Sequence, residues 1–260
     1  MGKIFKYSLY DLIRSRWSYI YFIFFVVSTT SLLYLSSDLS RAIVSLMNIV
    51  LLLCPLIGTM FGVMYYYNSR EFTELLLAQP IKRNSIFLGQ YLGLSVSLSI
   101  SFVLGIGIPF LFYGAIGSSQ LLSFLTLIFV GVALTFIFIG LAYIIALKNE
   151  NRIKGFGIAI VLWLFMAVIY DGLFLLSLFA FEDYPLDKFS LGVILFNPID
   201  LCRILVMLQL DISALLGYTG AIFNKFFGTS LGMIIATSCA MAWIAIPAFG
   251  IARISKKKDF

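Results

Sequence analysis

The chain has 260 residues, of which 62% are hydrophobic and 12% charged, and its formal net charge is +6 at pH 7. A soluble domain of this size needs more polar surface, so the composition predicts an integral membrane protein. The basic residues lie beside apolar segments, so membrane orientation explains them and no nucleic-acid partner is inferred.

The residue types that usually carry chemistry are scarce. Histidine is absent, and Cys54, Cys202 and Cys239 lie in apolar settings without CxxC spacing. This pattern predicts no metal site and no disulfide framework, and it disfavours an intramembrane enzyme. A copper path along the methionines of the second apolar segment is a weaker alternative, because methionine commonly fills membrane helices.

Six apolar segments are long enough to cross about 30 Å of hydrocarbon at about 1.5 Å per residue. They lie at residues 17–35, 42–67, 91–113, 121–147, 156–181 and 229–252. A seventh span at 204–223 would place the basic C-terminal end outside, against the positive-inside bias. With six spans and both termini cytoplasmic, the Lys and Arg residues left outside are Arg41, Lys188, Arg203 and Lys225. The sequence thus predicts one all-α transmembrane domain over residues 1–260.

The N-terminal segment is predicted to form an interfacial helix on the cytoplasmic leaflet. Lys3, Lys6 and Arg14 lie off its apolar face. That face is formed by Ile4, Phe5, Leu9, Leu12 and Ile13. In the second span that follows, Asn48 is a polar group able to hydrogen-bond between helices.

Between the second and third spans, residues 68–83 interrupt the apolar pattern with a short charged stretch. Glu71 and Glu74 lie one turn apart, and Pro80 is expected to end the helix. The pattern is typical of a cytoplasmic helix that docks on a soluble partner, and an ordinary interfacial helix is the alternative. The residues expected to make the docking contact are Glu71, Phe72, Glu74, Leu75, Gln79, Pro80, Lys82 and Arg83.

Asp171 is the charged residue placed well inside a predicted span. A carboxylate at the bilayer centre costs about 2.5–3.5 kcal/mol, so it should face the bundle interior, a partner or a cavity. One reading makes it part of a substrate or gating path. The other is a local helix break at residues 170–172 that leaves the acid partly wet.

The long loop at 182–228, placed outside, contains signals for a helical hairpin ahead of the sixth span. Asn197 and Pro198 form a helix start, and Asp200 and Arg203 form an i,i+3 pair. Asp211 is then expected to cap a second helix at 212–216, closed by Gly217. A hairpin that dips into the outer leaflet is favoured, and an amphipathic hairpin on the surface is the alternative.

This order of elements resembles the ABC-2 type permease family. Residues 74–83 (ELLLAQPIKR) with 87–93 (FLGQYLG) are similar to the coupling segment of the permeases of nitrous-oxide-reductase maturation transporters. Residues 197–201, 216–223 and 226–228 are similar to the outer hairpin of the same group. The resemblance covers the architecture of the whole chain and specific motifs in these two blocks.

The resemblance implies a homodimer in the bacterial inner membrane, with two cytosolic ATPase subunits docked on residues 68–90. It also implies a periplasmic β-helical partner on the outer hairpins and a role in assembling the copper–sulfide centre of nitrous oxide reductase. The chain has no GxxxxGK[ST] motif, so ATP and Mg²⁺ are expected on the partner ATPase, with no cofactor on this chain. The implied contacts to the periplasmic partner are Asn197, Pro198, Asp200, Arg203, Asp211 and Tyr218.

Two other functions remain open at this stage. The chain could be the permease of an ABC-2 exporter that carries another cargo, such as a lipid or a drug. It could also be a secondary transporter that uses Asp171 as an ion site, which would predict inverted repeats that the sequence does not display.

Overall fold

The computed structural model describes residues 2–36, 38–114, 120–181, 187–210 and 217–257, with only the backbone course of 187–188, 217–231 and 257. Within these ranges the regular secondary structure is entirely helical. In chain order the elements are α1 (Gly2–Ile13), α2 (Arg16–Leu35), α3 (Leu39–Asn68), α4 (Arg70–Leu77), α5 (Arg83–Phe112), α6 (Leu121–Lys148), α7 (Arg152–Leu164), the π-helix η1 (Phe165–Ile169), α8 (Tyr170–Ala180), α9 (Asp187–Phe196), α10 (Pro198–Gln209) and α11 (Gly217–Lys257).

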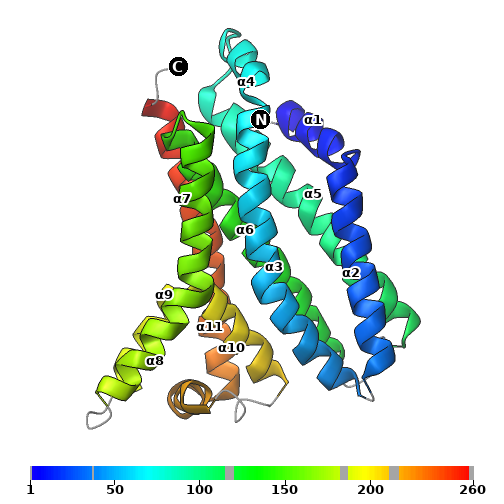
Figure 1. The fold of residues 1–260 in the computed structure, drawn as a ribbon, viewed down its shortest axis with the longest axis vertical. Helices are drawn as coiled ribbons and strands as arrows, with labels where there is room; N and C mark the ends of the chain where they lie inside the picture. Colours follow the sequence, from blue (N-terminus) through cyan, green and yellow to red (C-terminus); the bar gives the residue numbers. More distant parts are fainter. Residues whose placement is uncertain (1, 37, 115–119, 182–186, 211–216, 258–260) are drawn as a thin grey trace.

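Six helical stretches among the described residues are long and apolar enough to cross a membrane, which confirms the predicted fold class. They are α2, α3, α5, α6, the combined stretch α7–η1–α8, and residues 232–256 of α11. The pair α9 and α10 is bent by 107° and occupies one end of the molecule (Figure 1). It takes the place of the expected outer hairpin.

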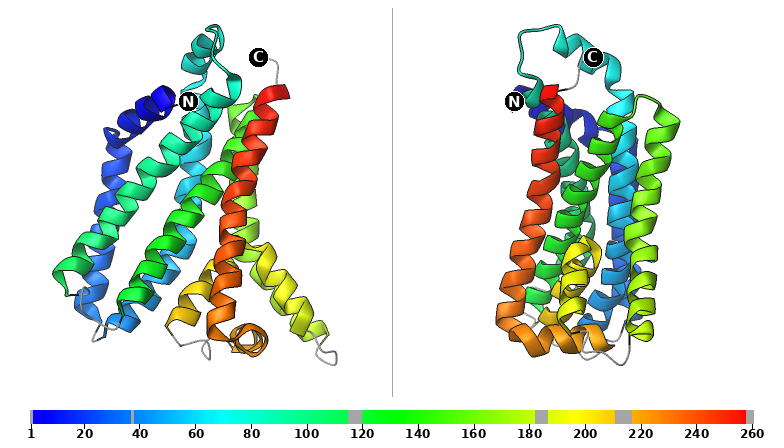
Figure 2. Two further views of the ribbon diagram at one scale, coloured as in Figure 1. Left: turned by 180° about the vertical axis from the view of Figure 1, so that it is seen from behind. Right: turned by 90° about the vertical axis from the view of Figure 1, so that its left-hand side faces the viewer.

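Helix α6 lies at the centre of the bundle, with α3, α5, α7, α10 and α11 packed around it (Figures 1 and 2). It has the most buried apolar window of the six candidate spans, at 61%. Helix α2 packs along α5 on one side. In contrast, α8 diverges from the bundle after η1, and none of its side chains is fully buried.

Helix α1 packs against α5 through a close backbone approach. A Cβ atom on Gly93 would lie 2.6 Å from Cβ of Ser8, so only glycine allows this contact. Ile4 and Leu12 are buried and Lys3 is exposed, as the predicted apolar face requires. The helix therefore rests on the third span.

Two element boundaries differ from the sequence-based expectation. Helix α5 starts at Arg83, eight residues before the predicted span, because Ile86 and Phe87 already pack in the core. Gly217 begins α11 instead of ending a helix, so that expectation was wrong. The expected helix at 212–216 and its cap Asp211 lie outside the described residues.

The described hairpin consists of α9 and α10, and α9 was not predicted. The orange first turns of α11 run across the same end of the bundle before the helix turns along it (Figure 2). At the opposite end lie α1, α4 and the C-terminal turns of α11 (Figure 1). We call the end that carries α1, α4 and the C-terminal turns of α11 the coupling end, after the docking role predicted for α4, and the opposite end the hairpin end.

Candidate functional site

Helix α4 lies at the coupling end, beyond the ends of the spans (Figure 1). It follows α3 after the single residue Ser69 and ends at Leu77, shortly before Pro80. Glu71, Glu74 and Leu75 are exposed, and the leucine keeps 68% of its surface accessible. An exposed leucine beside two carboxylates is a surface on which a partner can bury apolar area.

The other expected docking residues divide into two groups. Gln79, Pro80, Lys82 and Arg83 are exposed in and after the turn that leads to α5. Phe72 instead stacks its ring on Tyr7 of α1, with the ring centroids 4.9 Å apart. This contact within the chain was not predicted, and it ties α4 to α1.

A buried chain of polar side chains connects α4 to the spans. Nε2 of Gln90 donates a hydrogen bond of 2.9 Å to Oγ1 of Thr73. The Tyr143 hydroxyl donates to Oε1 of the same amide. Gln90 and Tyr143 are fully buried, and Thr73 is 4% exposed. This Thr73–Gln90–Tyr143 chain therefore joins α4, α5 and α6 through hydrogen bonds shielded from water, where breaking one is costly.

The sequence did not predict these hydrogen bonds between Thr73, Gln90 and Tyr143. A glutamine at the start of a span could be expected to seek a partner, because an unpaired amide in an apolar setting is unfavourable. The partner could not be identified, since Thr73 and Tyr143 lie 17 and 53 residues away along the chain.

At the hairpin end, Asn197 organises the break between α9 and α10. Its Oδ1 accepts from the Ile199 N–H at 3.1 Å, which confirms the predicted helix cap. Its Nδ2 donates to the Met166 carbonyl at 2.9 Å and to Oδ2 of Asp200 at 2.8 Å. Met166 lies in η1, where the widened turn changes the regular carbonyl pairing. One side chain thus links the hairpin to the fifth span.

Asp171 is paired rather than isolated. Nη1 of Arg203 lies 3.0 Å from Oδ2 of Asp171 and 3.0 Å from Oδ1 of Asp200. The predicted i,i+3 pair on α10 is therefore confirmed, and Asp171 of α8 completes it. The alternative of a helix break at 170–172 was wrong, because α8 is regular there and the irregular turn comes earlier, at Phe165–Ile169.

Two further hydrogen bonds hold the end of α9. The last carbonyls of a helix have no partner within the helix. The Tyr170 hydroxyl donates to the Val193 carbonyl at 2.6 Å, and Nε1 of Trp243 donates to the Leu195 carbonyl at 3.1 Å. Side chains of the fifth and sixth spans therefore hold the hairpin by hydrogen bonds. We call the contacts of Asn197, Asp171, Asp200, Arg203 and these two carbonyls the outer joint.

The structure gives a different role to several residues that were expected to contact the periplasmic partner. Asn197 and Pro198 are buried and Asp200 is 9% exposed, so their side chains serve the joint and face no outer surface of this chain. Arg203 is partly exposed, with 31% of its side chain accessible. Asp211 lies outside the described residues, and the side chain of Tyr218 is not described.

The pKa of Asp200 gives the outer joint an expected pH dependence. Burial, followed by the charge of Asp171, raises the pKa of Asp200 to about 7. In the unfolded chain an aspartate has a pKa of about 3.9, so the folded state binds this proton more tightly. The resulting stability is full below about pH 4 and is lost as the pH rises to about 7.

We expect the melting temperature of the wild type, minus that of Asp200→Asn, to fall between pH 4 and pH 7 and then level off. Thermal unfolding of the detergent-solubilised chain in a pH series measures this difference. Glu150→Gln, which changes an exposed carboxylate, is the matched control. A difference between wild type and Asp200→Asn that stays constant with pH would contradict the prediction.

Asn48 faces away from the other helices of this chain, so its hydrogen bonding between helices stays a prediction. Its side chain is exposed on α3, on the same face as the exposed Leu52. The apolar positions around it turn toward α6, which leaves the amide on the outside of the bundle.

The fold and these two ends define a helical, multi-pass membrane protein with an exposed helix at one end and a packed hairpin at the other. No protein-family model matches the chain. Two curated proteins are similar to it over most of their length, and both bear the name "Probable ABC transporter permease protein NosY".

The relative from Stutzerimonas stutzeri is 24% identical over 258 residues, which cover 92% of this chain and 91% of the relative. The relative from Pseudomonas aeruginosa is 22% identical over 234 residues, which cover 80% and 81%. The chain is similar to NosY at the level of the family. These relatives support the role of an ABC transporter permease subunit and imply a partner that carries the ATPase.

Proposed function

We propose that this permease subunit couples ATP hydrolysis by two cytosolic ATPase subunits to conformational work on, or export toward, a periplasmic partner. The subunit would act as a homodimer in the bacterial inner membrane, with both termini in the cytoplasm. ATP and Mg²⁺ would be held by the ATPase. The work would serve maturation of the copper–sulfide centre of nitrous oxide reductase, as the resemblance to the permeases of those transporters implies.

The observation that carries this proposal is the Thr73–Gln90–Tyr143 chain. A force applied to the exposed face of α4 reaches α5 and α6 through buried hydrogen bonds rather than through a flexible loop. The coupling end thereby becomes mechanically continuous with the centre of the bundle.

Helix α6 can pass this movement to the hairpin end. Its 28 residues span about 40 Å at about 1.5 Å per residue. Tyr143 lies near one end, and at the other end the Ser123 hydroxyl donates to the Gln209 carbonyl of α10 at 3.4 Å. Rigid-body movement of packed helices is an established way for such proteins to switch states.

A secondary transporter built on Asp171 is the competing function. The carboxylate has Arg203 as its partner at 3.0 Å, which supplies a structural reason for the charge. Transport by the purified chain alone, without nucleotide or ATPase, would favour this competitor.

The first test is purification of the tagged chain in mild detergent, followed by mass spectrometry of the accompanying proteins. We expect an ATPase in stoichiometric amount together with a periplasmic β-helical protein. An ATPase alone would support an exporter of another cargo, and the absence of any ATPase after crosslinking would contradict the proposal.

Glu74→Arg is expected to weaken ATPase association by about ten-fold or more, because a charge reversal at a docking surface opposes complementary charge. In the wild type, Glu74 pairs with Nε of Arg70 at 3.0 Å, and both side chains are about half exposed. Such a surface pair adds little to stability, so insertion and folding should be retained. Quantitative pull-down of the ATPase measures the effect.

The double variant Arg70→Glu/Glu74→Arg is the control. It restores an ion pair within α4 but keeps the reversed charge at position 74. If the double variant binds the ATPase normally, Glu74 supports only the helix and its assignment to the docking surface fails.

A further inference from the structure

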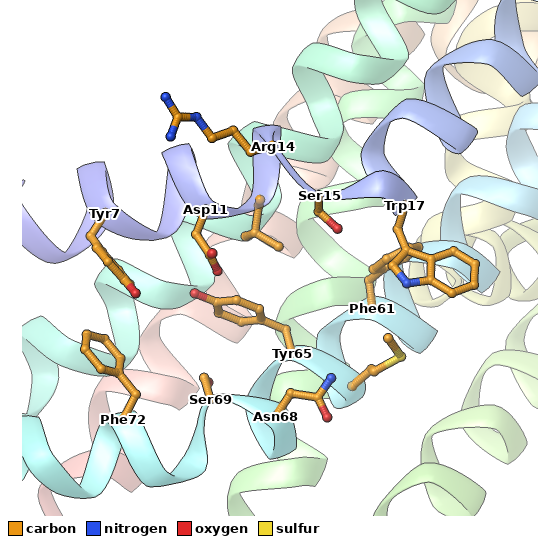
Figure 3. A pocket seen from close by; sticks show the side chains of 12 residues that line it. Tyr7, Asp11, Arg14, Ser15, Trp17, Phe61, Tyr65, Asn68, Ser69 and Phe72 are labelled. Atoms are coloured by element: carbon orange, nitrogen blue, oxygen red, sulfur yellow. The ribbon is translucent and has the colours of Figure 1, made fainter.

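A groove of about 570 Å³ lies at the coupling end, between α1, the beginning of α2, the end of α3 and α4. Aromatic rings from all four helices form its walls (Figure 3). Its main side chains are Tyr7, Asp11, Trp17, Phe61, Tyr65 and Phe72.

Two charged residues line the groove, Asp11 and Arg14, and they point in opposite directions. In Figure 3 the Asp11 carboxylate points toward the Tyr65 hydroxyl, whereas the guanidinium of Arg14 points away on the other side of α1. Among the described residues, the ion pairs do not include Asp11. The groove thus offers an unneutralised carboxylate to a positively charged group.

The walls also favour a cation. Tyr7 and Phe72 stack with centroids 4.9 Å apart, and Trp17 meets Phe61 edge to face at 6.3 Å. The faces of such rings carry partial negative charge and attract ammonium groups. A carboxylate set among aromatic rings is therefore chemically suited to an ammonium ion.

The position of the groove indicates where this ammonium ion comes from. Helix α1 carries an apolar face beside exposed lysines, as an interfacial helix does. Trp17 is 53% exposed at the first turn of the first span, and indole and phenol rings prefer the headgroup region of a bilayer. Phe61 and Met64 belong to a membrane span and give the groove an apolar side.

We propose that the groove binds the headgroup of a zwitterionic phospholipid with a primary ammonium group, such as phosphatidylethanolamine. Asp11 and the aromatic rings receive the ammonium group. The exposed basic side chains of α1 and the start of α2 lie beside the groove, where the phosphate of the same lipid can meet them.

The test is native mass spectrometry of the delipidated full chain, titrated with phosphatidylethanolamine and, separately, with phosphatidylglycerol, which lacks the ammonium group. The wild type should prefer phosphatidylethanolamine. Asp11→Asn should reduce this preference by about three- to ten-fold, the range expected for one partly exposed charge and a cation–π contact. Glu150→Gln, an exposed carboxylate outside the groove, should leave the preference unchanged.

A second variant, Trp17→Leu, removes an aromatic wall without touching the charge and should also reduce the preference. Equal binding of the two lipids by the wild type would overturn the proposal, as would an unchanged preference in Asp11→Asn. A third result is loss of ATPase association in Asp11→Asn without any lipid preference in the wild type. In that case the groove would receive a lysine of the partner, and the lipid proposal would fail.

Discussion

Replacing Gln90 with leucine is expected to uncouple ATP hydrolysis from the permease while leaving the ATPase bound. The substitution removes both hydrogen bonds of the amide and strands the hydroxyl of Tyr143 in a buried site. The Thr73 hydroxyl keeps its hydrogen bond of 2.8 Å to the Ser69 carbonyl. The stranded Tyr143 hydroxyl costs about 1–3 kcal/mol. Helix α4 then keeps the exposed face proposed to dock the ATPase but loses its polar link to α5 and α6.

Stimulation of ATPase activity by the reconstituted permease measures the coupling, and pull-down measures the association. We expect association within about two-fold of the wild type, since Gln90 is not at the docking surface, and a loss of most of the stimulation. Normal stimulation by Gln90→Leu would show that the buried chain is not the mechanical link.

A triple variant separates stability from coupling. Thr73→Val and Tyr143→Phe, added to Gln90→Leu, replace both former partners of the amide, and Tyr143→Phe removes the stranded hydroxyl. The triple variant should recover much of the lost melting temperature, because none of the three side chains leaves a buried polar group unsatisfied. Coupling should stay impaired, since the hydrogen bonds are still missing. Recovery of both properties would mean that the chain only stabilises the fold.

The elements of the coupling end were predictable because their signals are local. The apolar face of α1, the carboxylates of α4 and the helix-ending Pro80 each depend on residues within one or two turns. The inward direction of Phe72 and the role of Gln90 were not predictable. Both depend on how the helices rotate against one another, which a single sequence does not specify.

At the hairpin end, too, local features were predictable and long-range contacts were not. The cap joins Asn197 to a residue two positions further along the chain, and Asp200 pairs with Arg203 three positions further along. Both contacts are present in the structure. The contact of Arg203 in α10 with Asp171 in α8 joins residues 32 positions apart, and no local sequence pattern predicts it. The π-helix at Phe165–Ile169 contains no proline or glycine that would mark an irregular turn.

We expect replacement of Arg203 to destabilise the outer joint strongly. Replacing it with methionine keeps the length of the stem but leaves two neighbouring carboxylates, one of them largely buried, without their shared cation. Removing one partner of a buried ion pair typically costs about 3–5 kcal/mol. Because about 30% of the Asp171 and Arg203 side chains is exposed, we expect a value near the lower end of that range.

The hairpin should then detach locally, and a native cysteine reports on this. Cys202 is fully buried in α10, next to Arg203, while Cys54 is fully buried in α3. Thiol labelling, located by mass spectrometry, should increase at Cys202 in Arg203→Met and remain low at Cys54. Equal labelling of Cys202 in the wild type and Arg203→Met would show that the ion pairs do not hold the hairpin.

The matched control neutralises the whole group. In Asp171→Asn/Asp200→Asn/Arg203→Met no charge is left unpaired, so Cys202 should be protected again. Asp171→Asn alone leaves Arg203 paired with Asp200, so its labelling should stay close to that of the wild type. If this single variant folds normally but loses the function of the assembled transporter, Asp171 transmits movement between the fifth span and the hairpin. If it functions normally, the pair of Asp171 with Arg203 has a structural role alone.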